Sequence, residues 1–251
     1  MTDRRSFLRM TIMGATSVIV AGCDRISQSN WGPKVLGTAE GLNHRVQALL
    51  SPSSAMAREY SDADISAVFR PNGTIMPSTP TYQTLLANQF RDYKLQVDGM
   101  VSRPLMLSID DLKKLDTRSQ ITRHDCVEGW SVIGKWQGTL LSAVLDHAGV
   151  DPQARFVVFH CFDDMDQGTP YYESVDISEA RHPQTLLAFS LNDKPLPVPN
   201  GAPLRLRVSR QLGYKQAKYL RRIELVRSFA TIGEGHGGYW EDQGYEWYAG
   251  I

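Results

Sequence analysis

Hydrophobic residues recur along the chain with two different periods, and each period predicts a different element. The stretch YKLQVDGMV, residues 93–101, alternates apolar and polar side chains, which is typical of a strand with one buried face. SIDDLKKL has helical spacing, and Ser108 and Asp111 stand three residues apart, as in a capping box. GTLLSAVLDHAG predicts a short amphipathic helix that ends at Gly149, because glycine readily adopts the left-handed backbone of a helix terminus.

The second half of the chain is dominated by strand-like patterns. RFVVFHCF, TLLAFSLNDKPLP and KYLRRIELV each predict a strand, the second of them entering an Asn-Asp turn. In APLRLRVSR, apolar side chains alternate with Arg205 and Arg207, which predicts that the arginines lie on an outward face. The glycine- and aromatic-rich tail, residues 235–251, predicts an ordered loop. Strands outnumber helices and no repeat is present, so we expect one α+β domain with mixed sheets and short helices.

The N-terminus has the features of an export signal. Arg4 and Arg5 precede an apolar run that is too short to cross a bilayer as a helix, which is typical of a twin-arginine signal. The run ends in VAGC, which resembles the lipobox of bacterial lipoproteins. Acylation of Cys23 is therefore expected, with an ordinary cleaved signal as the alternative. Asp24 resembles the residue that retains such lipoproteins at the inner membrane, which predicts a lipid-anchored protein on its periplasmic side.

We therefore expect three parts in the chain. Residues 1–23 form the twin-arginine lipoprotein signal, residues 24–64 a tether and helical N-terminal segment, and residues 65–251 the functional domain. Twin-arginine export carries folded proteins, commonly because a cofactor was inserted before export, so the signal also predicts a bound cofactor. Lysine plus arginine equals aspartate plus glutamate at 27 each, so net charge favours no nucleic-acid partner.

One cysteine stands in an unusual setting, the stretch TRHDCVEGWSVIGKWQGT. The chain has 3 cysteines, too few for a disulfide framework, so Cys126 needs its own explanation. It fits a buried structural thiol, or a zinc ligand with His124, His160 and Cys161, although their spacing suits a tetrahedral site poorly. A nucleophile is a third interpretation, disfavoured because neighbouring acids raise a thiol's pKa. In the fourth, Cys126 ligates a redox metal held mainly by an organic cofactor, which one soft sulfur donor would complete.

RHDCVEGW resembles the metal-ligand segment of sulfite-oxidase-fold molybdopterin-dependent oxidoreductases. It is nearest to their short exported bacterial members, such as the catalytic subunits of protein-methionine-sulfoxide reductase. YKLQVDGMVSRPLMLSIDDL, LLAFSLNDKPLPVPNGAPLRLRV, GYKQAKYLRRIEL and the closing GGYWEDQGYEWY follow the family's order, so the resemblance covers residues 65–248. It implies a single sulfite-oxidase-type molybdopterin-binding domain.

The resemblance also implies roles for individual residues. Cys126 takes the position of the catalytic molybdenum ligand. The positions that match cofactor-binding residues are Asn72, Cys161, Asn200, Arg205, Gln216, Ala217 and Lys218. Positions that match substrate or pterin contacts are Arg70, Arg123, Tyr171 and Tyr172. Without the resemblance, the pattern would place Arg205 on an outward strand face and Lys218 in solvent.

The activity implied by the resemblance is oxygen-atom transfer with Mo-molybdopterin as cofactor. The Cys-Val-Glu-x-Trp-Ser stretch is closest to sulfoxide-reducing subunits, so we expect reduction of small-molecule or protein-bound S-oxides or N-oxides. The chain has no C-x-x-C-H haem motif, which implies a separate partner, either a membrane cytochrome b or a soluble c-type cytochrome. A sulfite-oxidase-like dehydrogenase passing electrons to a c-type cytochrome, an exported cysteine transpeptidase and a catalytically silent lipoprotein are the alternatives.

Overall fold

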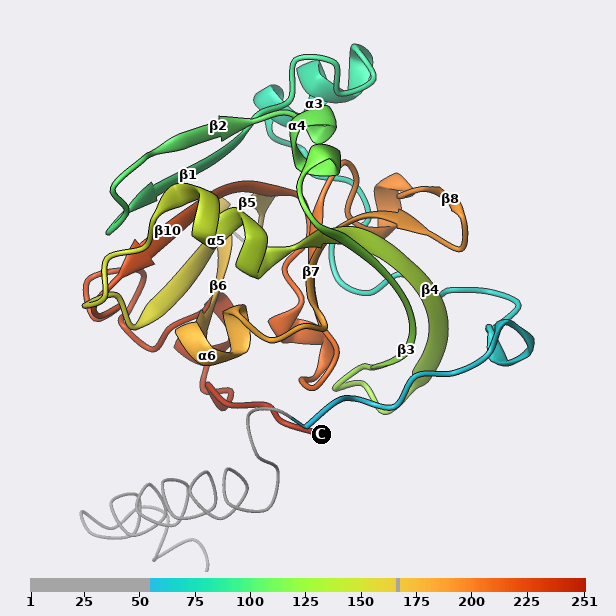
Figure 1. Ribbon diagram of the computed structural model, residues 1–251. Helices are drawn as coiled ribbons and strands as arrows, with labels where there is room; N and C mark the ends of the chain where they lie inside the picture. Colours follow the sequence, from blue (N-terminus) through green and yellow to red (C-terminus); the bar gives the residue numbers. More distant parts are fainter. Residues whose placement is uncertain (1–54, 166–167) are drawn as a thin grey trace, which may run out of the picture. The chain divides into compact units, whose positions relative to one another are not determined.

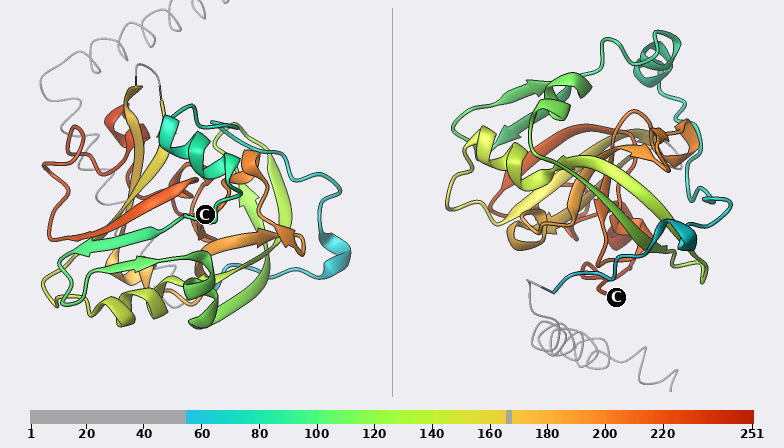
Figure 2. Two further views of the ribbon diagram at one scale, coloured as in Figure 1. Left: turned by 90° about the horizontal axis from the view of Figure 1, so that it is seen from above. Right: turned by 45° about the vertical axis from the view of Figure 1, so that its right-hand side comes forward.

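Two sheets form the frame of the computed structural model, which describes residues 55–165 and 168–251. The strands of the first sheet are, in spatial order, β2 (Leu105–Leu107), β1 (Leu95–Gly99), β10 (Leu220–Val226), β5 (Phe156–Asp164) and β6 (Pro170–Asp176). Those of the second are β3 (Thr117–Asp125), β4 (Ser131–Leu140), β7 (Thr185–Leu191) and β8 (Lys194–Pro195), with β9 (Arg205–Val208) paired to β7. The two sheets lie apart in Figure 1 and in both views of Figure 2.

The strand directions make the first sheet mixed. β1 pairs with β10 in parallel, whereas the pairs of β1 with β2, β10 with β5 and β5 with β6 are antiparallel. The second sheet is antiparallel throughout its described pairs. The strands predicted in the second half of the chain are confirmed, including the Asn-Asp turn, since Asn192 and Asp193 adopt positive φ between β7 and β8.

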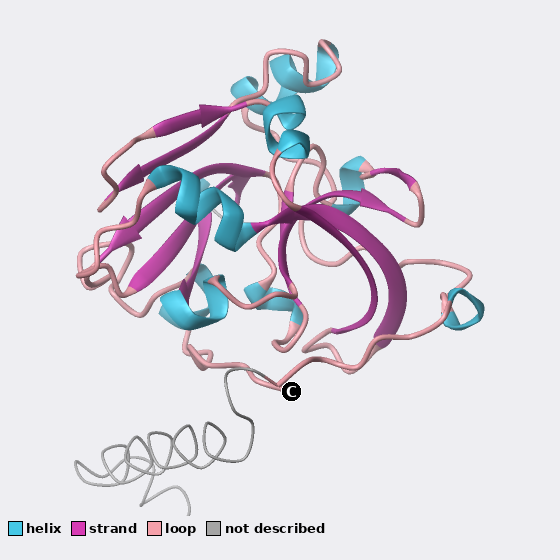
Figure 3. Cartoon of the chain, viewed as in Figure 1, coloured by secondary structure: helices cyan, strands magenta, loops and turns pink. Residues whose placement is uncertain are grey.

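Short helices surround the sheets (Figure 3). They are α3 (Pro80–Ala87), α4 (Ile109–Lys114), α5 (Leu141–Ala148), α6 (Ile177–Ala180) and α7 (Tyr239–Asp242), with 3-10 turns η1 (Asp62–Asp64), η3 (Val198–Asn200) and η4 (Gly213–Lys215). The capping box of α4 is present as predicted, since Ser108 and Asp111 exchange side-chain and backbone hydrogen bonds. Gly149 ends α5 at φ +67°, as the pattern predicted. The tail is mostly loop, with α7 inside it.

The main hydrophobic core joins the first sheet to α5. Leu141, Val144, Leu145 and Ala148 are fully buried at the spacing of one helix face, and they pack with strand residues such as Ile223. Burying a leucine or valine side chain contributes about 1.5–3 kcal/mol, so this face holds α5 firmly on the sheets. The result is a rigid frame whose strand ends and turns carry the site.

The predictions for the N-terminal part lie outside the described residues. They are the helical segment before residue 51, the twin-arginine signal and the lipidation of Cys23. The compact unit spans Ser53–Ile251, and Glu59 forms a bridge with Thr122 of β3. In the part of the chain that the structure describes, no helix has the length and apolarity needed to cross a membrane. The division of the chain at residue 64 stays a prediction.

The alternation in β9 gave the wrong exposure for its arginines. Arg205 and Arg207 are 0% exposed, and all four residues of the strand are buried. One edge of β9 pairs with β7, and the segment after η4 covers the other, where Leu206 N–H donates to the carbonyl of Ala217 at 2.8 Å. Both guanidinium groups lie against the ring of Trp136, with centroid distances of 5.0 and 5.2 Å. A strand covered on both faces and both edges buries polar positions that alternation alone would expose.

Candidate active site

Cys126 lies in the tight turn between β3 and β4. Its N–H donates to the carbonyl of Trp130 at 2.9 Å, and its own carbonyl accepts from Gly129 N–H at 3.0 Å. Gly129 adopts φ +85°, a left-handed conformation that glycine reaches without strain. The local sequence thus closes a hairpin that holds the cysteine at a defined point, with 8% of the residue exposed. Next to the turn, Asp125 pairs with Ser131 and His124 with Val132, and seven further residue pairs of β3 and β4 follow. This pairing fixes the position of the turn.

A cavity of about 150 Å³ lies beside the thiol. It gathers residues from distant parts of the chain, including six of the predicted site residues, which are Asn72, Cys126, Tyr171, Gln216, Ala217 and Lys218. Glu128 continues the wall from the cysteine turn, Gly213 and Tyr214 contribute from η4, and Trp240 contributes from α7. Cys126 and four of the seven residues that the resemblance assigned to the cofactor, Asn72, Gln216, Ala217 and Lys218, therefore meet around one space.

The surroundings of Cys126 keep its sulfur protonated in the cofactor-free chain. Burial raises the pKa of the Cys126 thiol, and the nearby carboxylate of Glu128 raises that pKa further. A nucleophilic cysteine needs the opposite shift, so the environment disfavours the transpeptidase interpretation. Within residues 55–165 and 168–251, no group of three His, Cys, Asp or Glu residues is arranged to hold a metal without other ligands. The sulfur is therefore suited to completing a metal that another group holds.

Three buried cations lie in the cavity wall or behind it. We call Arg205, Arg207 and Lys218 the cation cluster; Lys218 lines the cavity and the two arginines lie behind it. Arg205 donates to the carbonyls of Asn200 at 2.9 Å and Gln216 at 3.2 Å. Arg207 donates to the side-chain oxygen of Gln216 and to the hydroxyl of Thr122. All of these acceptors are neutral oxygens, so the charges are bound without being neutralised.

Lys218 completes the cluster at the cavity itself. Its ammonium donates to the carbonyls of Asn72 at 2.5 Å, Thr74 and Pro199. Among the ion pairs of the described residues, none joins a carboxylate to Lys218 or to either arginine of the cluster. Burial lowers the pKa of Lys218 to about 7, and of Arg205 to about 10, with the arginine charge lowering the lysine's pKa as well. A bound anion would counteract these lowered pKa values, because it stabilises the charged forms of the lysine and the arginine.

Unpaired donors point to the same conclusion. The Nε of Arg205, the Nε of Arg207 and the Nδ2 of Asn200 are buried donors without a hydrogen-bond partner. The Nε2 of His124 is also unpaired, but it is the acceptor nitrogen of its ring, because Nδ1 faces the Oε1 of Gln216 at 3.4 Å. Burial and the two arginines keep the pKa of His124 well below its usual range, so the ring is neutral. Orphaned buried donors cost about 1–3 kcal/mol each, and their concentration here marks a place for an acceptor from outside the chain.

Two glycines let the backbone approach these side chains closely. Gly201 has φ +111°, and a Cβ at this position would come within 3.0 Å of Lys218 and 3.1 Å of Arg205. A Cβ on Gly213 would meet the ring of His124 at 2.7 Å. Glycine is therefore required at both turns that flank the cation cluster. The donors, charges and turns fit the phosphate of a pterin cofactor, whose metal would lie toward Cys126.

A second buried charge cluster supports η4 from the opposite side. In the Lys215 network, which comprises Lys215, Glu173 and Glu241, the ammonium donates to both carboxylates, and all three side chains are at most 1% exposed. Burial raises the pKa of Glu173 well above its ordinary value, and the neighbouring Glu241 adds to the increase. One carboxyl group of the pair therefore keeps a proton, and the network is neutral as a unit.

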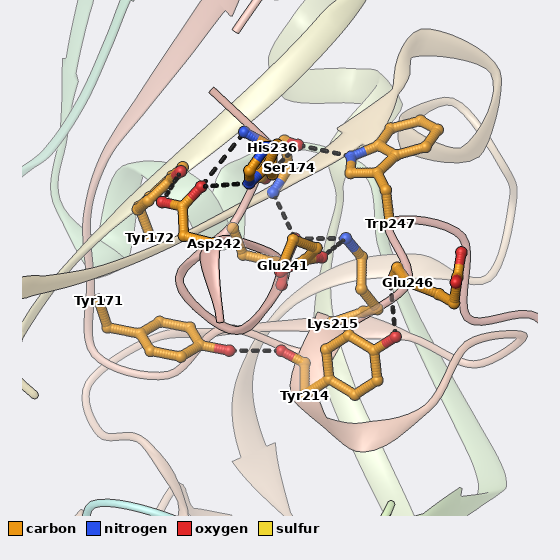
Figure 4. A network of polar contacts seen from close by, with 12 residues as sticks. Tyr171, Tyr172, Ser174, Tyr214, Lys215, His236, Glu241, Asp242, Glu246 and Trp247 are labelled. Carbon is orange, nitrogen blue, oxygen red and sulfur yellow. Dashed lines mark hydrogen bonds and ion pairs between the residues drawn. The ribbon is translucent and has the colours of Figure 1, made fainter. Parts of the chain in front are cut away.

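Further hydrogen bonds extend this network to the C-terminal segment (Figure 4). The hydroxyl of Tyr171 donates to the carbonyl of Tyr214 at 2.5 Å, and the hydroxyl of Tyr214 donates to the carbonyl of Glu246 at 2.7 Å. Tyr172 donates to Asp242 at 2.6 Å, and Asp242 also accepts from the backbone N–H of His236. The network ties β6, η4 and α7 together, which places Tyr171 and Tyr214 at the cavity.

Several predicted site residues lie away from the cavity. Cys161 is 1% exposed and packs in the main core from β5. Asn200 and Arg205 lie behind the wall, where Arg205 reaches it through its bond to Gln216. Tyr172 lines a neighbouring cavity of about 570 Å³. These residues stay predictions as direct cofactor or substrate contacts.

The two predicted arginine contacts near the cysteine turn are held by acids at the surface. Arg123 pairs with Asp125 at 2.8 Å, and its side chain is 52% exposed. Arg70 lies over the ring of Trp130 at 5.1 Å and 3.9 Å from Glu128. Neither lines the cavity beside Cys126.

Sequence reasoning missed other residues of the site. Asp163, Tyr214 and Trp240 line the cavity, and Arg207 belongs to the cation cluster. A signal existed for Asp163, since it stands two positions after Cys161 in a strand and must share its buried face. No local signal marked Tyr214 or Trp240, because their positions depend on the Lys215 network.

Fold and site together define a class of protein. They describe a mixed-sheet oxidoreductase domain in which one cysteine and a buried cationic wall surround a cavity for an anionic, metal-bearing organic cofactor. The chain belongs to the oxidoreductase molybdopterin binding domain family, whose model matches residues 82–231.

Similar proteins agree with this assignment. A protein of Azospira oryzae, provisionally named protein-methionine-sulfoxide reductase subunit YedZ1, is 35% identical over 98% of this chain and 87% of its own length. The protein-methionine-sulfoxide reductase catalytic subunit MsrP of Xanthomonas campestris pv. campestris is 39% identical over 53% of this chain and 45% of its own. MsrP of Campylobacter jejuni is 34% identical over 57% and 52%. The chain thus spans about half the length of these MsrP relatives.

A solved structure carries the same fold. The sulfane dehydrogenase SoxCD from Paracoccus pantotrophus aligns with a TM-score of 0.50 and 22% identity over 55% of this chain and 39% of its own. The predicted family, the α+β fold and the Mo-molybdopterin cofactor are confirmed, and the protein is a molybdopterin-dependent oxidoreductase.

Proposed function

We propose that this protein removes oxygen from S-oxides, including methionine sulfoxide in proteins, with a molybdenum centre at Cys126. The observation that carries the proposal is that the cysteine turn and the segment Gln216–Lys218, which contacts the cation cluster, line one cavity. The names of the similar YedZ1 and MsrP proteins support the same substrate class.

Each part of the site then has a distinct task. When bound, Mo-molybdopterin supplies the two-electron oxygen-atom transfer. Cys126 would hold the metal through its sulfur, and its thiol proton must leave as the sulfur binds, because only the thiolate is a ligand. Lys218 and Arg205 would hold the pterin phosphate, and Tyr171 and Trp240 narrow the cavity and exclude water from it.

The charge of the cavity favours an uncharged substrate. Its described lining contains one cation, Lys218, and two acids, Glu128 and Asp163. Sulfite is an anion at neutral pH and would need uncommitted cations, whereas Arg70 and Arg123 are engaged by acids at the surface. A sulfoxide is neutral and has apolar substituents, so it suits the aromatic lining. N-oxides share both properties and belong to the same screen.

The remaining parts of the proposal concern delivery and electrons. We infer that the twin-arginine signal exports the folded protein and that Cys23 anchors it on the periplasmic side of the inner membrane. Electrons would then come from a separate cytochrome, since the sequence has no haem-attachment motif of its own. An anchored protein meets a membrane cytochrome b more readily than a soluble c-type cytochrome, which is the second candidate.

The test compares two buried cysteines, Cys126 and Cys161. We expect Cys126→Ala, made in a host that synthesises molybdopterin, to lose molybdenum and at least about 100-fold in sulfoxide reduction, because even outer-shell changes at metal sites cost 10–100-fold. Cys161→Ala serves as the control, since Cys161 lies outside the cavity. Metal analysis, circular dichroism and assays with reduced viologen and methionine sulfoxide, free or in a protein, give the readouts.

Two outcomes would contradict the proposal. Loss of molybdenum in Cys161→Ala with full retention in Cys126→Ala would place the metal elsewhere. A fully loaded wild-type protein that oxidises sulfite with ferricyanide, and reduces no S-oxide or N-oxide, would instead make it a sulfite-oxidase-like dehydrogenase.

A further inference from the structure

The proposed reaction consumes protons as well as electrons. Reduction of a sulfoxide follows R–S(=O)–R′ + 2 e⁻ + 2 H⁺ → R–S–R′ + H₂O, with the electrons supplied by a one-electron carrier protein. The sulfur–oxygen bond breaks, and two O–H bonds form on an oxygen that starts inside a cavity of about 150 Å³. A side chain on the cavity wall can supply a proton to that oxygen directly, as a general acid.

Most acidic or basic groups on that wall are committed elsewhere. Cys126 is the proposed metal ligand, and Lys218 donates to three backbone carbonyls. Tyr171 and Tyr214 donate their hydroxyl hydrogens to carbonyls, and burial raises the pKa of both. Glu128 has a 56% exposed side chain and accepts from the indole of Trp130. Tyr245 also lines the wall, where its ring stacks on Trp240. Asp163 is the remaining carboxyl group of the described wall.

Asp163 has the geometry of a proton donor. It stands near the end of β5, lines the cavity and is 4% exposed. Its Oδ1 is buried and has no hydrogen-bond partner. A carboxylate in such a place keeps a charge out of water, whereas a carboxylic acid does not. Lys218 and a hydrogen bond from the side chain of Thr74 lower the pKa of Asp163, but burial has the larger effect. Burial accordingly raises the pKa of Asp163 to about 7.

The groups around Asp163 oppose one another. Lys218, before β10, is the facing cation and lowers the pKa of Asp163, while Asp164 next to it on β5 raises that pKa. The other titratable neighbours are neutral at physiological pH because burial raises their pKa, and they are Tyr82 on α3, Cys161 on β5, Tyr171 on β6 and Tyr219 before β10. A phosphate held by Lys218 would add negative charge and offset the lysine, so cofactor binding favours the protonated acid.

We propose that the carboxyl group of Asp163 donates a proton to the oxygen atom that leaves the substrate. The O–H bond of the acid breaks, its electron pair stays on the carboxylate, and a new O–H bond forms on the departing oxygen with one of that atom's lone pairs. The carboxylate, faced by Lys218, then takes a proton from solvent, so each cycle consumes two solvent protons in total. This role rests on the proposed S-oxide reduction.

The protonation state can be measured without turnover. Infrared difference spectra of wild type against Asp163→Asn isolate the carbonyl stretch of one protonated carboxyl group. We expect that band in the cofactor-free protein to disappear with a midpoint near pH 7, and at a higher pH in the loaded protein. Asp164→Asn, a neighbouring acid outside this cavity, should keep the band and move its midpoint to lower pH, because the charge of Asp164 raises the pKa of Asp163. Absence of the band above pH 5 in both forms overturns the inference.

Kinetics supply the second readout. The acid must be protonated to act, so the wild-type kcat should fall as pH rises through the pKa of Asp163. General acid catalysis contributes about 100- to 10,000-fold, so Asp163→Asn should lose that much in kcat, keep KM and lose the pH dependence. Asp163→Glu, which keeps a carboxyl group, should retain a pH-dependent rate. Asp164→Asn should keep the wild-type kcat at low pH, with the fall in rate moved to lower pH.

The two failures are distinguishable. If the loaded wild type reduces S-oxides and Asp163→Asn does so with equal kcat and the same pH profile, the inference is wrong and the proposed function stands. If the loaded wild type reduces no S-oxide, the proposed function is wrong, and the role of Asp163 in it is lost with it.

Discussion

The protein buries two clusters of positive charge that lie close together in its sequence. They differ in whether carboxyl groups of the chain balance the charge. In the Lys215 network, one ammonium lies between Glu173 and Glu241, and the group is neutral. In the cation cluster, Arg205, Arg207 and Lys218 contact neutral oxygens and leave donors unpaired. Charge balance inside the chain marks the first as structural, and its absence marks the second as a place for an external anion.

The two clusters share one segment. Lys215 ends η4 and Lys218 follows three residues later, so the same loop is fixed on one side by the network and offers its charge to the cavity on the other. A structural cluster has to be complete before a ligand arrives, whereas a binding cluster has to be incomplete. The predictions below separate these two properties by measuring stability with and without an anion.

The largest effect is expected from Lys215→Met. Removing the cation leaves two buried carboxyl groups with their unpaired oxygens, and breaking a buried ion pair on one side costs about 3–5 kcal/mol. Urea unfolding of the cofactor-free protein measures the loss. Combining Lys215→Met with Glu173→Gln and Glu241→Gln should restore much of the stability, because no uncompensated charge then remains. A loss below about 1 kcal/mol in the single variant would contradict a structural role.

The cation cluster should respond to an added anion instead. Inorganic pyrophosphate in excess should stabilise the cofactor-free protein, by about 2.7 kcal/mol at a concentration 100 times its Kd. Lys218→Met should lose most of this gain, because the ammonium faces the cavity. Lys194→Met, at an exposed position in β8, is the matched control and should keep it. Equal stabilisation of the Lys218 and Lys194 variants in thermal unfolding would show that the anion binds elsewhere.

The smallest effect is expected at the surface near the cysteine turn. Arg123→Ala removes an ion pair with Asp125 whose arginine is 52% exposed, and such pairs are worth about 0–1 kcal/mol. Sulfoxide reduction should be unchanged within about 2-fold, because Arg123 does not line the cavity. A loss of 10-fold or more in kcat/KM would restore Arg123 as a substrate contact, as its place in the sequence first suggested.

Local patterns in the sequence predicted much of the fold. The capping box at Ser108, the glycine end of α5 and the strands of the second half follow from spacing within a few residues, and the structure contains them. The exposure of Arg205 and Arg207 could not be predicted in that way. It depends on β7 and on the segment after η4, which approach β9 from opposite edges.

The candidate site likewise has residues that a short motif predicted and residues whose positions depend on the tertiary structure. The position of Cys126 at the cavity followed from one short motif, because the turn that holds it is local. Asp163, Tyr214 and Trp240 reach the same cavity from three other parts of the chain, and no single stretch of sequence contains that information. The resemblance to known oxidoreductases supplied Gln216 and Lys218, and residue patterns alone would have placed Lys218 in solvent.

The hydrogen bond from Lys218 to Asn72 joins residues 146 positions apart. During synthesis, the hairpin of Cys126 can form as soon as it leaves the ribosome, but the wall opposite it does not exist until nearly the whole polypeptide has been made. Capture of the cofactor must therefore follow translation rather than accompany it. The cell accordingly has an interval in which the finished but empty protein waits, and any quality control of cofactor loading has to act within it.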